Sequence, residues 1–555
     1  MNKLVTFILL ALPFIGFAQA DWENPKGAIK DEEVVIEKDK QITLPVISRR
    51  FEAITIDLPQ RDTTAVVKAP RDIVLTIPKI PVKLRPKPMK GELLEQTYWG
   101  SFKVGYGSYI SPLIQADVAT KRSDEYALAL HFRHYSSKNG PVDKANSGMS
   151  NTDAYVNGKL FLNAVTLGAH LGANLGKYHL YGYEGLASVP IAEDIQQTLT
   201  NYSVGVDLTD NDKNEDFTYA LKGGIELFHA KDLLWKESDF YADLRTRYTI
   251  FDDMDIQINA GLHSSKQEKN LFPLTTNRLL YKINPIVTYK MEPFEFEIGA
   301  GLFGTKDSVN SFQHKIYFAP HLVARYTFEG GHIVSGGVTG DVQWQSARTQ
   351  FNENPYLGGF TVVNSDVKPL DFFLKANGKI APKLSYSAGY HAAIYKLIGQ
   401  YLNMPGDPST FYLYYDEGNN FKQTFSAALD FEASKNLSFQ LNGSYFTYAF
   451  ENYSNAWHMP DYDLRAKVRF TLEEKLTTEL VFTYLGGLKA LEPNFTAQTV
   501  TLNPIADLNL NVDYKVSNMI SVFVKMQNIL GNQYQYFYKY PTKGFQVLGG
   551  VRFTF

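Results

Sequence analysis

Apolar and polar side chains alternate along the end of the chain. From Phe545 to Phe555 the odd positions carry Phe, Val and Gly, whereas the even positions carry Gln, Leu, Gly, Arg and Thr. Side chains of a β-strand point alternately to opposite faces of the sheet. The pattern therefore predicts a strand with one apolar face and one mostly polar face.

The same period of two recurs through most of the chain. It is clear in the segments 167–175, 242–250, 464–470 and 507–514. Counting such segments back from the C-terminus predicts about 22 strands, within a range of 14 to 22. The expected spans are 101–108, 112–120, 124–135, 153–162, 165–183, 199–207, 216–229, 238–250, 254–264, 277–290, 294–303, 314–327, 332–346, 367–380, 384–395, 421–433, 437–449, 460–472, 475–486, 504–516, 519–530 and 543–555.

Short polar turns separate these strands in pairs, and longer segments join the pairs at the opposite end. The turns are expected at Asp252-Asp253, Glu292-Pro293, Gly330-Gly331, Pro382-Lys383, Lys435-Asn436, Glu473-Glu474 and Ser517-Asn518. A transmembrane barrel has short periplasmic turns and longer outer loops. The C-terminus is therefore expected on the periplasmic side.

The alternation alone fits a soluble β-sandwich as well as a membrane barrel, because both have one apolar and one polar face on each strand. Three further features favour the barrel: the strand length, the terminal aromatic Phe555 and a secretory leader. The predicted fold is all-β, a transmembrane antiparallel up-and-down barrel of residues 96–555, preceded by a short periplasmic arm. We expect it in the bacterial outer membrane, with lipid as its surroundings.

The first twenty residues resemble a secretory signal peptide. Lys3 precedes an apolar run from Leu4 to Phe17, and Ala18-Gln19-Ala20 offers small residues for a signal peptidase. The run is too short to cross a bilayer. We expect cleavage after Ala20, and Asp21 in the next position excludes a lipid-anchored cysteine.

Residues 21–95 differ from the rest of the chain because they hold eight of its 25 prolines. Proline removes a backbone donor and is poorly tolerated inside sheets. The stretch from Lys79 to Lys90 is basic as well as proline-rich. This segment is expected to form an extended periplasmic arm, and a disordered leader is an equally open alternative.

Composition excludes several function classes. Cysteine is absent, so disulfides and thiolate metal sites are impossible, and the net charge of -3 without a basic tail speaks against nucleic acid as a partner. The 35 tyrosines and 37 phenylalanines suit strands and interfacial girdles. His131 and His134 differ in parity, so they would point to opposite faces of one strand. No motif predicts a catalytic residue, a metal site or a cofactor, and an enzyme is not expected.

The chain end is similar to that of TonB-dependent outer-membrane receptors. The resemblance rests on Gln527-Asn-Ile-Leu-Gly-Asn-Gln-Tyr534, on Tyr540-Pro-Thr-Lys-Gly544 and on the closing strand. It implies a barrel of 22 strands, a receptor or transport function, and TonB as a partner. Such barrels hold a folded plug in the lumen, and the proline-rich residues 21–95 are too few for a complete one.

Because residues 21–95 are too few for a complete plug, two alternatives remain open. Glu33-Val-Val-Ile36 resembles the short box that contacts TonB, although it also reads as an ordinary patch in an extended arm. Without a standard plug, the chain could instead be a structural or accessory barrel of a larger envelope assembly. The small-molecule or peptide ligand of a receptor, and any other envelope partner, is not indicated by the sequence.

Two groups of side chains are candidate binding residues. Arg245, Arg247, Arg465, Lys467 and Arg469 are expected on the lumen face, where they could hold a filler or simply contact water. Residues 396–420 are expected to form a long outer loop. Its aromatic side chains, together with one tryptophan of another loop, could contact a ligand or partner, or belong to the girdle. These candidates are Phe411, Tyr412, Tyr414, Tyr415 and Trp457.

Overall fold

The computed structural model describes residues 98–555, apart from the internal segments 184–187, 212–215, 270–273, 308–313 and 494–497. The expected signal peptide, residues 1–20, and the expected arm, residues 21–95, lie outside the described residues.

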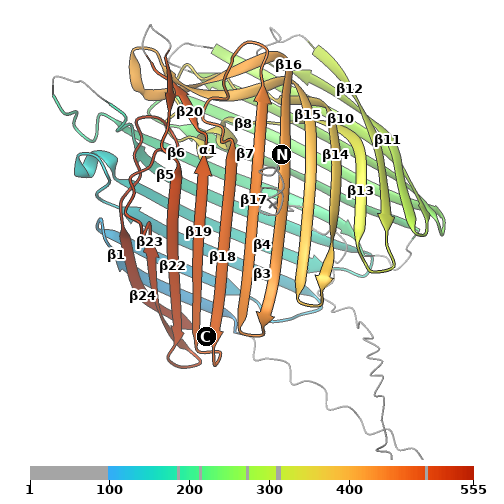
Figure 1. Ribbon diagram of the computed structural model, residues 1–555, viewed down its shortest axis with the longest axis horizontal. Helices are drawn as coiled ribbons and strands as arrows, with labels where there is room; N and C mark the ends of the chain where they lie inside the picture. The colour runs from blue at the N-terminus through green and yellow to red at the C-terminus, as the bar shows by residue number, and fades with distance from the viewer. Residues whose placement is uncertain (1–97, 184–187, 212–215, 270–273, 308–313, 494–497) are drawn as a thin grey trace, which may run out of the picture. The chain divides into compact units, whose positions relative to one another are not determined.

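Twenty-two strands form one sheet that closes into a barrel (Figure 1). Each strand pairs antiparallel with its neighbours in sequence, and the first strand pairs with the last. The strands of the barrel are β1 Gly100–Gly107, β2 Ser111–Ala119, β3 Tyr126–Ser137, β4 Met149–Phe161, β5 Val165–His179, β6 Gln196–Asp210, β7 Phe217–Ala230, β8 Trp235–Phe251, β9 Met254–Lys269, β10 Leu274–Met291, β11 Phe294–Lys306, β12 His314–Thr327, β13 Ile333–Gln343, β14 Asp366–Ala381, β15 Leu384–Met404, β16 Asp407–Ser434, β17 Leu437–Ala449, β18 Tyr462–Leu472, β19 Leu476–Gly486, β22 Ile505–Lys515, β23 Ile520–Gln527 and β24 Gln546–Thr554.

The predicted fold class is confirmed. Every expected strand span overlaps one strand of the barrel, and every expected short turn lies between two consecutive strands. These turns and the C-terminus share one end of the barrel, at the bottom of Figure 1. The strand count follows from the period of two, which only a regular sheet with one apolar face imposes over so long a chain.

The expectation of a long loop at residues 396–420 is wrong. β15 continues to Met404 and β16 begins at Asp407, so a two-residue turn joins two unusually long strands. Gly406 has φ +83°, a conformation that glycine adopts without strain. The backbone pairing of β15 with β16 continues beyond residue 396 as far as Met404 and Asp407. The hairpin is therefore longer than a strand pair needs to be to cross the membrane.

Few other elements occur among the described residues. β20 Lys489–Leu491 and β21 Thr499–Thr501 form a small separate hairpin, η1 Lys144–Ser147 is one turn of 3-10 helix, and α1 Ala347–Glu353 is a short α-helix. In this part of the chain no helix is both long and apolar enough to cross a membrane.

The outer face of the barrel is apolar. On β8 the even positions Phe240, Leu244 and Tyr248 are exposed to the outside, whereas the odd positions Glu237 and Asp239 are buried inside. Lipid offers no hydrogen-bonding partners, so a sheet within it must pair every backbone group, which closure achieves. Alternation with polar side chains inside is the pattern of a transmembrane barrel.

The seam of the barrel explains the aromatic end of the chain. The backbone N–H groups of Trp99 and Gly100 donate to the carbonyl oxygen of Phe555 at 2.8 and 3.0 Å. The Trp99 and Phe555 rings meet edge to face with centroids 4.4 Å apart. β1 and β24 approach so closely that a Cβ at Gly550 would collide with the carbonyl of Val104. The final residue therefore locks the last strand onto the first.

The register of β18 yields a test of the two faces. Val468 lies opposite Phe439 and Leu480, both exposed on the lipid face, whereas the Lys467 ammonium pairs with Glu479 at 2.9 Å inside. Val468→Arg should cost roughly 2–4 kcal/mol near the midplane, because a charge would face lipid. Lys467→Ala should cost about 0–1 kcal/mol, as expected for a half-exposed ion pair. The measurement is urea-dependent folding into lipid vesicles, and equal losses in the two variants would contradict the register.

Candidate functional site at the mouth of the barrel

The segment between β13 and β14 folds into the barrel instead of outward. We call residues 344–365 the inner loop. It contains α1, whose first turn is capped by Ser346, since the Ser346 Oγ accepts from the backbone N–H of Thr349 at 3.1 Å. The N–H of Ala347 donates to a carboxylate oxygen of Glu237 on β8 at 2.5 Å. The positive end of the helix thus faces an acidic wall residue.

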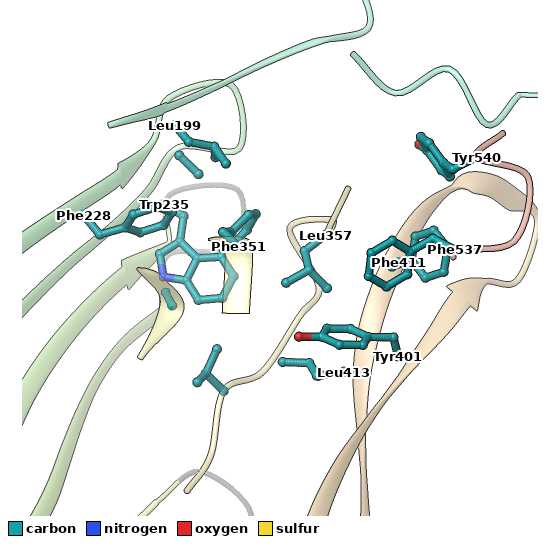
Figure 2. Close-up of a cluster of buried hydrophobic side chains, with 13 residues drawn as sticks. Leu199, Phe228, Trp235, Phe351, Leu357, Tyr401, Phe411, Leu413, Phe537 and Tyr540 are labelled. Atoms are coloured by element: carbon teal, nitrogen blue, oxygen red, sulfur yellow. The ribbon is translucent and has the colours of Figure 1, made fainter. Parts of the chain in front are cut away.

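Apolar packing attaches the inner loop to the wall made by β6, β7 and β8. Phe351 is fully buried, with its ring centroid 5.3 Å from those of Phe228 and Trp235 (Figure 2). Gln197 on β6 donates to the carbonyl of Pro355 at 2.6 Å. The loop therefore crosses from the β13–β14 side of the barrel to a wall several strands away.

The inner loop also meets the opposite side of the mouth. Residues 528–545, between β23 and β24, form the last loop. The Tyr356 ring stacks on that of Tyr540 with centroids 3.6 Å apart, and Phe411 on β16 lies against both Phe537 and Tyr540. Figure 2 shows Leu357 between the β8 wall and Phe411. The buried cluster therefore bridges the mouth, from β6–β8 across the inner loop to β15, β16 and the last loop.

A buried ion pair fixes both ends of the inner loop. Arg278 on β10 and Asp307 after β11 are almost completely buried, with Nε and Oδ1 2.7 Å apart. The guanidinium also donates to the carbonyl of Gln345 at 2.7 Å, and Asp307 accepts from the N–H of Ser365 at 3.1 Å. Arg278 lies over the ring of Trp344 at 4.3 Å. Removing one member would leave a buried unpaired charge, which is strongly unfavourable.

The inner loop and the role of Arg278 do not follow from the strand pattern of the sequence. The signal was a break in the period of two after Gln343, followed by Ser346 at a capping distance from Thr349. The partner of Arg278 follows from no local pattern, because Asp307 and Ser365 are distant in sequence.

His458 connects three segments of the same rim. It is 3% exposed in the loop between β17 and β18. Its Nδ1–H donates to the carbonyl of Tyr401 at 2.9 Å, and its Nε2 accepts from the N–H of Tyr538 at 3.2 Å. Burial lowers the pKa of His458 to about 4, so the ring is neutral at physiological pH.

The aromatic residues expected at an outer contact surface have other positions. Phe411 and Trp457 are buried at 0% and 2% exposure, so the expectation that they form an outer surface is wrong. The Tyr415 hydroxyl accepts from the backbone N–H of Asn364 at 2.8 Å. Tyr412 and Tyr414 are half-buried, and Tyr414 packs edge to face on Tyr453. Packing against sequence-distant loops, which a local pattern does not reveal, explains the difference.

The basic residues expected in the lumen lie on inward-facing positions of their strands. Arg245 and Arg247 share the odd face of β8 with Glu237 and Asp239, which contact the inner loop. Arg465, Lys467 and Arg469 occupy the odd positions of β18, and Arg469 lies opposite Glu479. The ion pair of Lys467 with Glu479 shows that this charge is balanced within the wall.

Two cavities flank the bridge. One of about 560 Å³ lies below the start of the inner loop, with Asp239, His263, Lys282, Asp341 and Trp344 in its wall. The other, of about 400 Å³, lies between the last loop and the walls formed by β3–β5 and β22–β24. Among the described residues, no group of three or more His, Cys, Asp and Glu side chains could hold a metal ion.

The histidines considered in the sequence are dispersed over separate contacts. His131 Nδ1 lies 2.5 Å from Asp117, and His134 Nδ1 lies 2.8 Å from the Thr152 hydroxyl. Neither contact brings further ligands together. The described side chains at the mouth offer aromatic faces, amides and paired charges, which are groups suited to noncovalent binding.

Comparison with known proteins identifies the class of fold. No family model matches the chain, and no curated protein matches its sequence. Solved structures match over most of its length. The FrpB iron transporter from Neisseria meningitidis has a TM-score of 0.63 at 9% identity, covering 83% of this chain and 82% of that one.

A siderophore receptor and a pyoverdine receptor match similarly. PirA from Acinetobacter baumannii has a TM-score of 0.63 at 11% identity, with 82% of this chain and 80% of PirA covered. The pyoverdine receptor FpvA from Pseudomonas aeruginosa PAO1 has a TM-score of 0.61 at 13% identity, with 83% and 79% covered. The chain therefore has the 22-strand barrel fold of TonB-dependent outer-membrane receptors, as the end of its sequence predicted. At sequence identities this low, the structural similarity establishes the fold alone.

Protonation of His458 gives a test of the rim contacts. Its folded pKa is lowered from 6.5 to about 4, so the folded rim loses stability as pH falls from about 6.5 towards 4 and is unaffected above. The loss should be at most about 3 kcal/mol. Hydrogen exchange of residues 450–461 as a function of pH measures it. His458→Gln keeps one donor and one acceptor but does not titrate, so its protection factors, referenced to the intrinsic exchange rate at each pH, should be independent of pH. An identical pH profile in both proteins would assign the effect to another group.

Proposed function

We propose that the chain is an outer-membrane barrel of the receptor or transport type, in which the inner loop and the last loop gate the mouth. The observation that carries this is the apolar bridge across a wide lumen, from the β6–β8 wall to β15 and β16. A barrel of 22 strands is wide enough to pass solutes unless something fills it. A gate inside the mouth suits a protein that admits selected solutes.

The solved structures of the same fold support this assignment. Their names describe an iron transporter, a siderophore receptor and a pyoverdine receptor. By analogy of fold, the present chain would take up a solute from outside the cell. TonB is the proposed partner, through Glu33-Val-Val-Ile36, and uptake should then stop in cells that lack TonB or when this segment is replaced.

The alternative, a structural or accessory barrel, differs in what accompanies the protein. An accessory barrel would be extracted in mild detergent together with other envelope proteins, and it would show no solute dependence. A transporter would show solute-dependent behaviour whether or not other chains are present.

Conductance in planar bilayers tests the gate. Replacing residues 347–363 with a Gly-Ser linker of equal length should raise single-channel conductance, because the Phe351 and Leu357 contacts across the mouth are lost. Phe360→Ala is the matched control, since Phe360 lies in the same loop but is 59% exposed. It should leave conductance unchanged. If the linker variant conducts like the original protein, the inner loop does not gate the passage.

Deletion of residues 21–95 is tested by the same conductance measurement, alone and combined with the Gly-Ser replacement of residues 347–363. The barrel should still assemble, because its backbone pairing closes between Gly100 and Thr554. We propose that the arm contributes a second obstruction, so the double change should conduct more than either single change. Equal conductance of the double change and the linker variant would remove the arm from this role.

A further inference from the structure

The cavity beside the last loop has the wall of a ligand site. We call it the side cavity. Its volume of about 400 Å³ lies within the range of roughly 300–1,000 Å³ that is usual for small-molecule sites. It draws residues from the upper ends of β3, β5, β22, β23 and β24, and from both loops that bridge the mouth. A solute that reaches it is therefore held next to the proposed gate.

Two uncommitted amides face this cavity side by side. Gln527 and Gln546 are direct cross-strand partners at the upper ends of β23 and β24, and both line the cavity. Neither side chain makes a hydrogen bond within the described part of the chain. Each amide offers two N–H donors and one acceptor oxygen. Two adjacent amides of this kind match a pair of neighbouring hydroxyl groups.

A third polar group has a defined tautomer. The Nδ1–H of His179 donates to the carbonyl of Gly148 at 2.7 Å, which leaves Nε2 available to a ligand in the cavity wall. The Lys543 ammonium lies 2.5 Å from the Ser137 hydroxyl, and burial lowers the pKa of Lys543 to about 8.

The wall carries no net charge. Apart from His179, the charged side chains of this wall are Lys543 and Asp507, one of each sign. An anionic chelate or a polyanion would meet no excess of positive charge here. A neutral solute with many hydroxyl groups would not have to transfer a charge from water into the cavity, so it avoids that desolvation cost.

Tyrosines supply the apolar part of the wall. Tyr135, Tyr178 and Tyr534 are half-buried and come from β3, β5 and the last loop. Burial and Asp507 raise the pKa of Tyr534 to about 12, so its hydroxyl remains a donor. Ring faces suit the C–H face of a sugar, while phenol and amide groups suit its hydroxyl rim. Tyr181 and Tyr356 also line the cavity, and the sizeable aliphatic side chains in its wall are Met149 and Pro141, too few for the side-chain pockets of a peptide.

We infer that the side cavity binds a neutral saccharide of one or two rings. Gln527, Gln546 and His179 Nε2 would hold its hydroxyl groups, and Tyr534 would stack on its C–H face. As the substrate class of an uptake route, this inference rests on the proposed function. As a binding site, it can be measured independently.

The test is calorimetric titration of the purified full chain with glucose, galactose, mannose, maltose and cellobiose, with glucose 6-phosphate as the charged control. At least one neutral sugar should bind with a dissociation constant in the millimolar range or tighter, and the phosphorylated sugar should bind less well. The double variant Gln527→Leu/Gln546→Leu should lose at least about tenfold in affinity, since both amide contacts disappear. The control Gln440→Leu changes an inward-facing glutamine on β17 outside the cavity wall and should bind as the original does.

Variants of Tyr534 test the site independently if the glutamine double variant fails to assemble. Tyr534→Ala lies in the last loop and should weaken binding, whereas Tyr534→Phe keeps the ring and should retain most of it. Absence of binding by every neutral sugar, or equal affinity in the glutamine double variant, overturns the inference. Sugar binding without solute-dependent conductance would keep the site and reject the uptake function. Gated conductance without sugar binding would keep the proposed gate and reject the saccharide site.

Discussion

The structure depends on one constraint: backbone groups that face lipid must bond to each other, because lipid cannot replace water as their partner. A sheet in that setting has to close, and here the closure lies between β1 and β24, where Phe555 accepts hydrogen bonds from Trp99 and Gly100. Closure of 22 strands leaves a wide lumen. The bridge across the mouth is the consequence of that width for any protein that must not leave an open hole.

The bridge combines two kinds of interaction with different roles. The apolar cluster around Phe351, Leu357 and Phe411 provides burial, which is non-directional and stabilises a compact arrangement. The buried pair of Arg278 and Asp307 provides direction, because its hydrogen bonds specify where the inner loop leaves β13 and enters β14. Breaking such a pair typically costs about 3–5 kcal/mol, so the ends of the loop are fixed even if its middle opens. This division suits the proposed gate, whose ends are fixed by the ion pair and whose centre is held by apolar packing alone.

The barrel could be predicted from the sequence because its information is local. The alternation along β8 or β18 predicts the strand, its two faces and the turn that ends it from neighbouring residues alone. The mouth could not be predicted in this way. The strand count from the sequence places Phe411 in an outer loop between two predicted strands, but the residue lies in β16 and packs against Phe537 and Tyr540, more than a hundred residues away. Arg278 reads as one more polar position of a strand until Asp307 and Ser365 are seen beside it.

The inner loop and the last loop meet inside the mouth, where the Tyr356 ring stacks on that of Tyr540. The chain has no cysteine, so Tyr356→Cys with Tyr540→Cys introduces the only two thiols. Treatment of outer membranes with a short bifunctional thiol reagent, followed by mass spectrometry of peptides, measures their proximity directly. We expect an intramolecular cross-link for this pair and none for Tyr356→Cys combined with Val468→Cys on the lipid face. Single labelling of both thiols in the first pair, without a cross-link, would contradict it.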